Sequence, residues 1–212
     1  MKKFLKHDNK FTFLSGLYDT LRDGDAEGFQ TQFTAFLQEY LAIYYTPHHK
    51  EKVYQALCFM LIFALFGQDY DVRMEQDTGH GQSDITAFPF NLQRLQAFIF
   101  EIKSVAPHLK RNGKQSFKPR ECIEKDLENA KTEGLAQIAN RRYRARVPRQ
   151  AMKVHEFVFG FSGKFYVAAV RTLERNVTGD WGEVTVKSTA VSECMVDTDM
   201  GEEDVGDEDE EA

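Results

Sequence analysis

Three charged residues, Asp84, Glu101 and Lys103, could together bind a divalent metal ion and assist the hydrolysis of a phosphodiester. Glu101 and Lys103 are two residues apart, so on a strand they would share one face. Such a pair can be a simple ion pair on the solvent-facing side of an edge strand. The preceding stretch, 95–102, is instead apolar at both odd and even positions, which indicates a central strand covered on both faces. Charge at the end of a buried strand is costly unless it is paired or binds a metal.

Asp84 supplies a second carboxylate. It starts the preceding strand, and an antiparallel hairpin would set it beside Glu101. Two carboxylates that close repel each other unless a divalent cation keeps both ionised. Oxygen ligands without a nearby His or Cys favour Mg²⁺ or Mn²⁺ over Zn²⁺. Such an ion polarises a phosphate and activates a bound water, and Lys103 would act there as a base or as an electrostatic stabiliser.

Two helices are expected to precede these strands, because apolar residues recur three or four positions apart. The first spans 29–45 and is ended by Pro47. The second spans 49–66, stops at Gly67 and is apolar nearly all round, which predicts burial between other elements. The residues expected to face inward are Val53, Tyr54, Leu57, Met60, Leu61 and Ala64.

The rest of the chain predicts an α/β fold with a mixed β-sheet and helices on both faces. The strands have alternating or continuous apolar residues, and the first three form a meander. A long loop, 104–120, and a helix, 121–144, are expected between the third and fourth strands. The expected strands are 70–76, 83–88, 95–103, 154–161, 165–171 and 183–187.

Residues 81–85 (GQSDI), followed by 98–103 (FIFEIK), resemble the PD-(D/E)XK nuclease superfamily, in particular the branch often fused behind an AAA-type ATPase. The resemblance covers about residues 50–170 and implies a restriction-endonuclease-like fold. Ser83 stands where the superfamily name has Pro, a variable position without a ligand role. By this resemblance Glu51 would be a further metal or water ligand, and Gln137 would orient substrate or a metal-bound water.

These helper residues also have simpler interpretations. Glu51 could be an acidic residue favoured in the first turn of a helix. Gln137 could lie on a helix surface, and Tyr143, which the resemblance also includes, could merely pack. His80, just before the site, could touch a phosphate. The other five histidines lack a matching partner and are expected at the surface: His7, His48, His49, His108 and His155.

The resemblance implies a Mg²⁺- or Mn²⁺-dependent nuclease that acts on DNA in preference to RNA. The alternative is a nuclease-like fold that serves as a non-catalytic binding module. No Gly-x-x-x-x-Gly-Lys-Ser/Thr motif occurs, so any ATPase partner would act in trans. Basic residues on both sides of the third helix are candidates for contacting the nucleic-acid backbone: Lys110, Arg111, Lys114, Lys118, Arg141 and Arg142.

The formal net charge of −6 is concentrated at the C-terminal end. Residues 197–212 hold ten Asp or Glu and no Lys or Arg, and the remaining residues carry a net +4. Residues 193–212 are therefore expected to form a disordered acidic tail, which either keeps the protein soluble or mimics nucleic acid on the basic face. The other expected units are an N-terminal segment of short helices, 1–28, and the nuclease-like domain, 29–192.

Composition also limits the setting of the protein. The three cysteines, Cys58, Cys122 and Cys194, are widely separated and form no Cys-x-x-Cys pair, which argues against disulfides and a thiolate zinc site. The longest apolar run, 56–66, is about half of what a membrane-spanning helix needs. The N-terminus lacks the apolar stretch of an export signal. A reducing cytoplasm is the expected location.

Overall fold

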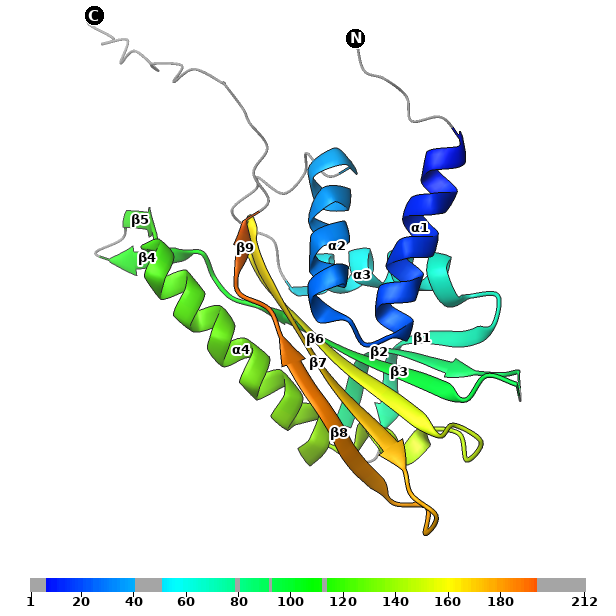
Figure 1. Ribbon diagram of the computed structural model, residues 1–212. Coiled ribbons are helices and arrows are strands. Elements are labelled where there is room, and N and C mark those ends of the chain that lie inside the picture. Colours follow the sequence, from blue (N-terminus) through cyan, green and yellow to red (C-terminus); the bar gives the residue numbers. More distant parts are fainter. Residues whose placement is uncertain (1–6, 41–50, 79–80, 92, 112–113, 194–212) are drawn as a thin grey trace, which may run out of the picture.

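The computed structural model describes residues 7–40, 51–78, 81–91, 93–111 and 114–193 (Figure 1). Its centre is a seven-stranded sheet of order β1-β2-β3-β6-β7-β8, with β9 paired to β7. The helices are α1 (His7–Arg22), α2 (Ala26–Tyr40), α3 (Glu51–Phe66) and α4 (Arg120–Asn140), with the 3₁₀ helix η2 (Tyr143–Arg146). The strands are β1 (Tyr70–Thr78), β2 (Gly81–Pro89), β3 (Gln96–Ser104), β4 (His108–Arg111), β5 (Lys114–Phe117), β6 (Lys153–Ser162), β7 (Phe165–Arg175), β8 (Trp181–Ser188) and β9 (Ser192–Glu193).

The expected mixed sheet with helices on both faces is confirmed. Strands β1, β2 and β3 form the antiparallel meander, and α4 connects β3 to the parallel strand β6. Helices α1, α2 and α3 cover one face, whereas α4 covers the other (Figure 1). Strand β3 lies between β2 and β6, and its residues 97–102 are buried on both faces, as its apolar sequence predicted.

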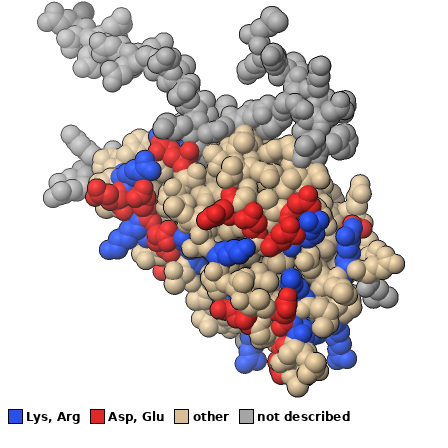
Figure 2. Space-filling model, in the orientation of Figure 1, with Lys and Arg blue, Asp and Glu red and all other residues tan. Residues whose placement is uncertain are grey.

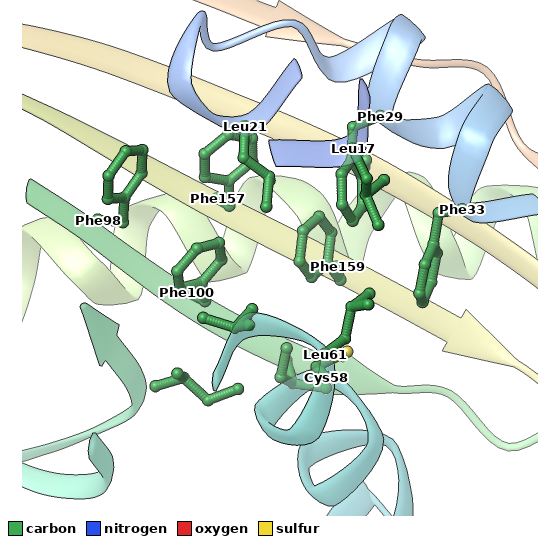
Figure 3. Close-up of a cluster of buried hydrophobic side chains, with 14 of the residues drawn as sticks. Leu17, Leu21, Phe29, Phe33, Cys58, Leu61, Phe98, Phe100, Phe157 and Phe159 are labelled. Atoms are coloured by element: carbon green, nitrogen blue, oxygen red, sulfur yellow. The ribbon is translucent and has the colours of Figure 1, made fainter. Parts of the chain in front are cut away.

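The face under the first three helices holds a core rich in phenylalanine (Figure 3). Phe98 and Phe100 of β3 pack beside Phe157 of β6, and the α2 ring of Phe29 stacks on β6 at 4.8 Å from Phe159, centroid to centroid. Offset aromatic contacts of this kind add stabilisation beyond that from the area they bury. Packing in this core fixes the positions of the central strands, and therefore also the positions of their ends.

Helix α4 lies unusually close to the opposite face. A Cβ on Gly134 would come within 2.5 Å of the Val158 side chain, so only glycine permits this approach. Ile138, one turn later, is fully buried against β3 and β6 residues. The close packing fixes the last two turns of α4 over the sheet.

Several local predictions were wrong. The expected loop at 104–120 contains the β4–β5 hairpin, and the expected helix 121–144 ends at Asn140 before the separate η2. On α3, Val53, Met60 and Ala64 point outward, so one side of that helix is open rather than buried.

The expectation that His155 lies at the surface was also wrong. It is buried on β6, where its ring stacks on Phe98 and its Nδ1 lies 3.0 Å from the Thr172 hydroxyl. Burial lowers the pKa of His155 to about 4. The other four histidines expected at the surface have no described side-chain position.

The N-terminal stretch before residue 29 contains the 16-residue helix α1 and the start of α2. Leu17 and Leu21 of α1 are fully buried in the phenylalanine-rich core. At the other end Glu193 belongs to β9, while residues 41–50, including the expected stop at Pro47, and 194–212 of the expected tail lie outside the described residues. None of the described helices is long and apolar enough to cross a membrane.

Replacing Leu17 by Ala is expected to lower the free energy of unfolding by about 2–5 kcal/mol, because the change leaves a cavity in the shared core. Urea denaturation monitored by circular dichroism measures this loss. The exposed Val177 supplies the control, and Val177→Ala is expected to change stability by less than about 0.5 kcal/mol. A similarly small loss for Leu17→Ala would mean that α1 is dispensable to the fold.

Candidate active site

The site forms where β2 and β3 separate. Their ladder pairs Ile85 with Phe100, and in the same register Asp84 would come next to Glu101, beyond the last paired residues. There the Asp84 carboxylate accepts the backbone N–H of Ile102 at 2.6 Å. A side-chain oxygen thus satisfies a strand N–H that the ladder leaves free, and it holds the carboxylate between the two strands.

Helix α3 contributes a second contact to Asp84. The buried side chain of Gln55 donates to Asp84 Oδ1 at 3.0 Å and is 3.4 Å from Glu51 Oε1. Glu51 itself is exposed at the first position of the helix. The sequence prediction missed Gln55, although a glutamine among the apolar residues of a core helix was a usable signal.

Glu101 is nearly inaccessible, with 1% of its surface exposed. One oxygen, Oε1, accepts from Lys103 Nζ at 2.7 Å and from the Gln137 side-chain amide. Lys103 also donates to Gln137 Oε1 at 2.8 Å. The other oxygen, Glu101 Oε2, is buried and has no hydrogen-bond partner among the described residues. The structure therefore brings Glu101, Lys103 and Gln137 into direct contact and leaves one carboxylate oxygen unused.

Both carboxylates resist ionisation. Burial raises the pKa of Asp84 to about 6, opposed by the Ile102 N–H and the charge of Lys103. Burial and the neighbouring charge of Asp84 raise the pKa of Glu101 to about 7, opposed by Lys103. A cation held by both oxygens would reverse these shifts, because it favours the ionised forms.

The donor set fits a hard divalent cation. No group of three or more His, Cys, Asp or Glu capable of holding a metal occurs in the described ranges. Mg²⁺, however, keeps several of its waters and is bound through only one or two carboxylates in many enzymes. Asp84 and the free oxygen of Glu101 meet that requirement, and the charge of nearby Glu51 acts on Asp84.

Glu75 is a further acidic residue that the sequence prediction missed. It lies on β1 between Met74 and Gln76, at the position across from Asp84 of β2. Its backbone is left-handed, with φ 51°. A non-glycine residue in that conformation stores strain, and such strain gathers at functional sites. Its carboxylate pairs with Lys52 at 3.1 Å, and its charge contributes to the raised pKa of Asp84. No pattern in the sequence marks this backbone conformation.

The predicted basic residues fall into two groups. Arg141 follows α4, and its side chain lies across Gly81 so closely that a Cβ there would come within 2.8 Å of Arg141 Cδ. Its charge slightly opposes the rise in the pKa of Glu101, and the neighbouring Arg142 is exposed. Lys118 instead forms an ion pair, at 2.7 Å, with Asp126 of α4.

The structure does not describe the side chains of the other residues predicted to contact nucleic acid. Lys110 and Arg111 belong to β4 and Lys114 to β5, with only their backbone described, and His80 lies outside the described residues. On the face shown in Figure 2, acidic and basic side chains lie side by side, so this face is not a uniformly positive surface.

Glu101→Gln is expected to weaken the pH dependence of stability in the absence of metal. Since the pKa of Glu101 is raised from 4.5 to about 7, the folded protein holds a proton that the unfolded chain releases, and the free energy of unfolding falls as pH rises through this interval. Urea titrations near about pH 5 and about pH 8 should show a smaller fall in the variant than in the wild type. Equal falls would contradict the burial of an ionisable Glu101.

Comparison with known proteins agrees with this geometry. No curated protein matches the chain. A sequence model described as the PD-(D/E)XK nuclease superfamily matches residues 49–169, more than half of the chain. The match begins just before α3 and includes β2, β3 and α4, the elements that carry Asp84, Glu101, Lys103 and Gln137. The chain belongs to the PD-(D/E)XK nuclease superfamily.

Proposed function

We propose that this protein is a divalent-metal-dependent nuclease that hydrolyses phosphodiester bonds, with DNA preferred over RNA. The observation that carries the proposal is Glu101 Oε2, which has no hydrogen-bond partner among the described residues and is buried beside a second carboxylate whose pKa is also raised. A buried carboxylate oxygen without a donor is unfavourable unless a ligand completes it. Mg²⁺ or Mn²⁺ supplies such a ligand.

Asp84 and Glu101 would hold the metal, with Glu51 as an additional ligand to the ion or its water. A bound divalent ion polarises the scissile phosphate and lowers the pKa of a coordinated water. Asp84 is kept in place by Ile102 and Gln55 before any ion binds. The site is therefore preorganised from both β3 and α3.

Lys103 has a role of its own in this proposal. Its ammonium group is shared between Glu101 Oε1 and Gln137 Oε1, which points one donor group toward the carboxylate that would hold the metal. Lys103 is partly exposed, with 20% of its side chain accessible. From there it would stabilise negative charge developing on the phosphate, as a positioned cation does in phosphoryl transfer.

Nucleic acid would be held through its phosphates. Arg141 and Arg142 follow the end of α4 and are exposed; the charge of Arg141 acts on Glu101, and its side chain also contacts the Tyr143 hydroxyl. Phosphate contacts fix orientation without reading sequence, which suits a nuclease without base-specific recognition. Lys110, Arg111, Lys114 and Lys118 would extend this binding surface.

Asp84→Asn and Lys103→Met are each expected to reduce Mg²⁺-dependent cleavage at least about a hundredfold while leaving the fold intact, because each removes charge at the reacting phosphate. Cleavage of duplex DNA, single-stranded DNA and RNA substrates with Mg²⁺ or Mn²⁺ measures the effect and the DNA preference. Chelator should abolish cleavage.

The matched controls are Asp71→Asn and Lys187→Met, which change the same residue types on β1 and β8. Both are expected to retain wild-type rates. Metal-independent cleavage, or wild-type rates in Asp84→Asn, would disprove the proposed function.

Mn²⁺ is expected to bind the wild type in calorimetric titrations, more tightly near about pH 8 than near about pH 6, because protons compete for carboxylates with raised pKa values. Glu101→Gln should abolish the binding heat. Binding that is absent at both pH values would favour the alternative of a non-catalytic module.

A further inference from the structure

A continuous chain of hydrogen bonds leads away from the Glu101 carboxylate. The amide group of Gln137, on α4, donates both to Glu101 Oε1 and to the hydroxyl of Tyr143, the latter at 3.1 Å. The Tyr143 hydroxyl donates in turn to the backbone carbonyl of Gln82 at 2.6 Å. The chain thus connects the end of β3 to α4, to η2 and to β2.

The chemistry of the partners fixes the direction of every bond in this chain. A carbonyl oxygen only accepts, so the single proton of the Tyr143 hydroxyl must go to Gln82. The hydroxyl oxygen is then left as an acceptor for Gln137 Nε2 and for the Arg141 side chain. Lys103 only donates, so it faces the amide oxygen of Gln137. Tyr143, Glu101 and Lys103 therefore all select the same one of the two possible orientations of the Gln137 amide.

Tyr143 is itself held rigidly. It is fully buried, and it opens η2 directly after Arg142, whose backbone is left-handed with φ 54°. Burial raises the pKa of the Tyr143 hydroxyl, so the group remains a protonated donor.

An ion cluster anchors η2 to the sheet. Arg144 of η2 contacts the buried carboxylate of Glu156 on β6 at 2.8 Å, and Arg171 of β7 contacts the same carboxylate. Arg171 also donates to the carbonyl of Leu135 on α4 at 2.8 Å. The elements that carry Tyr143 and Gln137 are thus both attached to β6 and β7 through this cluster.

We propose that Tyr143 is a positioning residue that fixes the orientation of the Gln137 amide against Glu101 and Lys103. Its role in catalysis rests on the proposed nuclease function. With the amide held, Gln137 Nε2 occupies one oxygen of Glu101, and the other oxygen stays free for the metal. Without the hydroxyl, the Gln137 amide loses the contact that holds it on the side of η2 and can rotate away from Glu101, and Lys103 then loses one of its two acceptors.

Tyr143→Phe tests the proposal, because it removes the hydroxyl and keeps the ring. The first readout is the side-chain amide resonance pair of Gln137 in a ¹⁵N–¹H spectrum of the metal-free protein, assigned by its loss in Gln137→Leu. This pair is expected to move toward the shifts of a solvent-exposed glutamine. The second readout is cleavage, where kcat is expected to fall about tenfold and KM to stay within about twofold.

The matched control is Tyr166→Phe. Tyr166 is equally buried, and its hydroxyl donates to a backbone carbonyl, that of Gln30, on the opposite side of the sheet. This variant should lose comparable stability and leave both the Gln137 resonances and kcat unchanged.

Gln137 resonances that stay unchanged in Tyr143→Phe, or that move equally in Tyr166→Phe, overturn the positioning role whether or not the wild type cleaves nucleic acid. Resonances that move as expected in a wild type without cleavage support the positioning role and disprove the proposed function instead.

Discussion

Burying Glu101 and partly burying Asp84 at the point where β2 and β3 separate places two negative charges in a region of low polarity, and the surrounding elements are arranged to offset that free-energy cost. Asp84 accepts hydrogen bonds from the backbone N–H of Ile102 and from the side-chain amide of Gln55. Glu101 accepts hydrogen bonds from Lys103 and Gln137, both on the same oxygen. These partners do not fully offset burial and the repulsion between the two carboxylates, which together keep the pKa of Glu101 raised.

The arrangement requires both faces of the sheet. Gln55 reaches Asp84 from α3, whereas Gln137 reaches Glu101 from α4 on the opposite side. The aromatic core holds α3 against β3, and the close contact of Gly134 with Val158 sets the distance of α4. Packing on the α3 face therefore controls the position of Asp84, and packing on the α4 face controls the position of Glu101. A site of a few polar groups thus depends on the packing of the whole domain.

The sequence alone was sufficient to predict the sheet with helices on both faces and the proximity of the charged residues Asp84, Glu101 and Lys103, because each prediction rests on a local pattern. Apolar residues on both faces of 97–102 indicate a central strand, and charged residues at the end of such a strand depart from that apolar pattern. Helix α3 shows the limit of such patterns. It is apolar all round, so its sequence does not tell the buried Leu61 from the exposed Met60. The β4–β5 hairpin escaped prediction because its strands are short and rich in charge.

The parts of the site that could not be predicted are those defined by contacts between distant residues. The burial of His155 depends on a ring of β3 and a hydroxyl of β7, and the left-handed backbone of Glu75 depends on pairing within the sheet. Tyr143 was equally compatible with simple packing, because its partner is a backbone carbonyl 61 residues earlier. Asp84 and Glu101 differ from these residues in one respect. The free-energy cost of their charges near a buried strand can be inferred from the sequence. The structure shows the same cost as a Glu101 oxygen that has no hydrogen-bond partner in the described part of the chain.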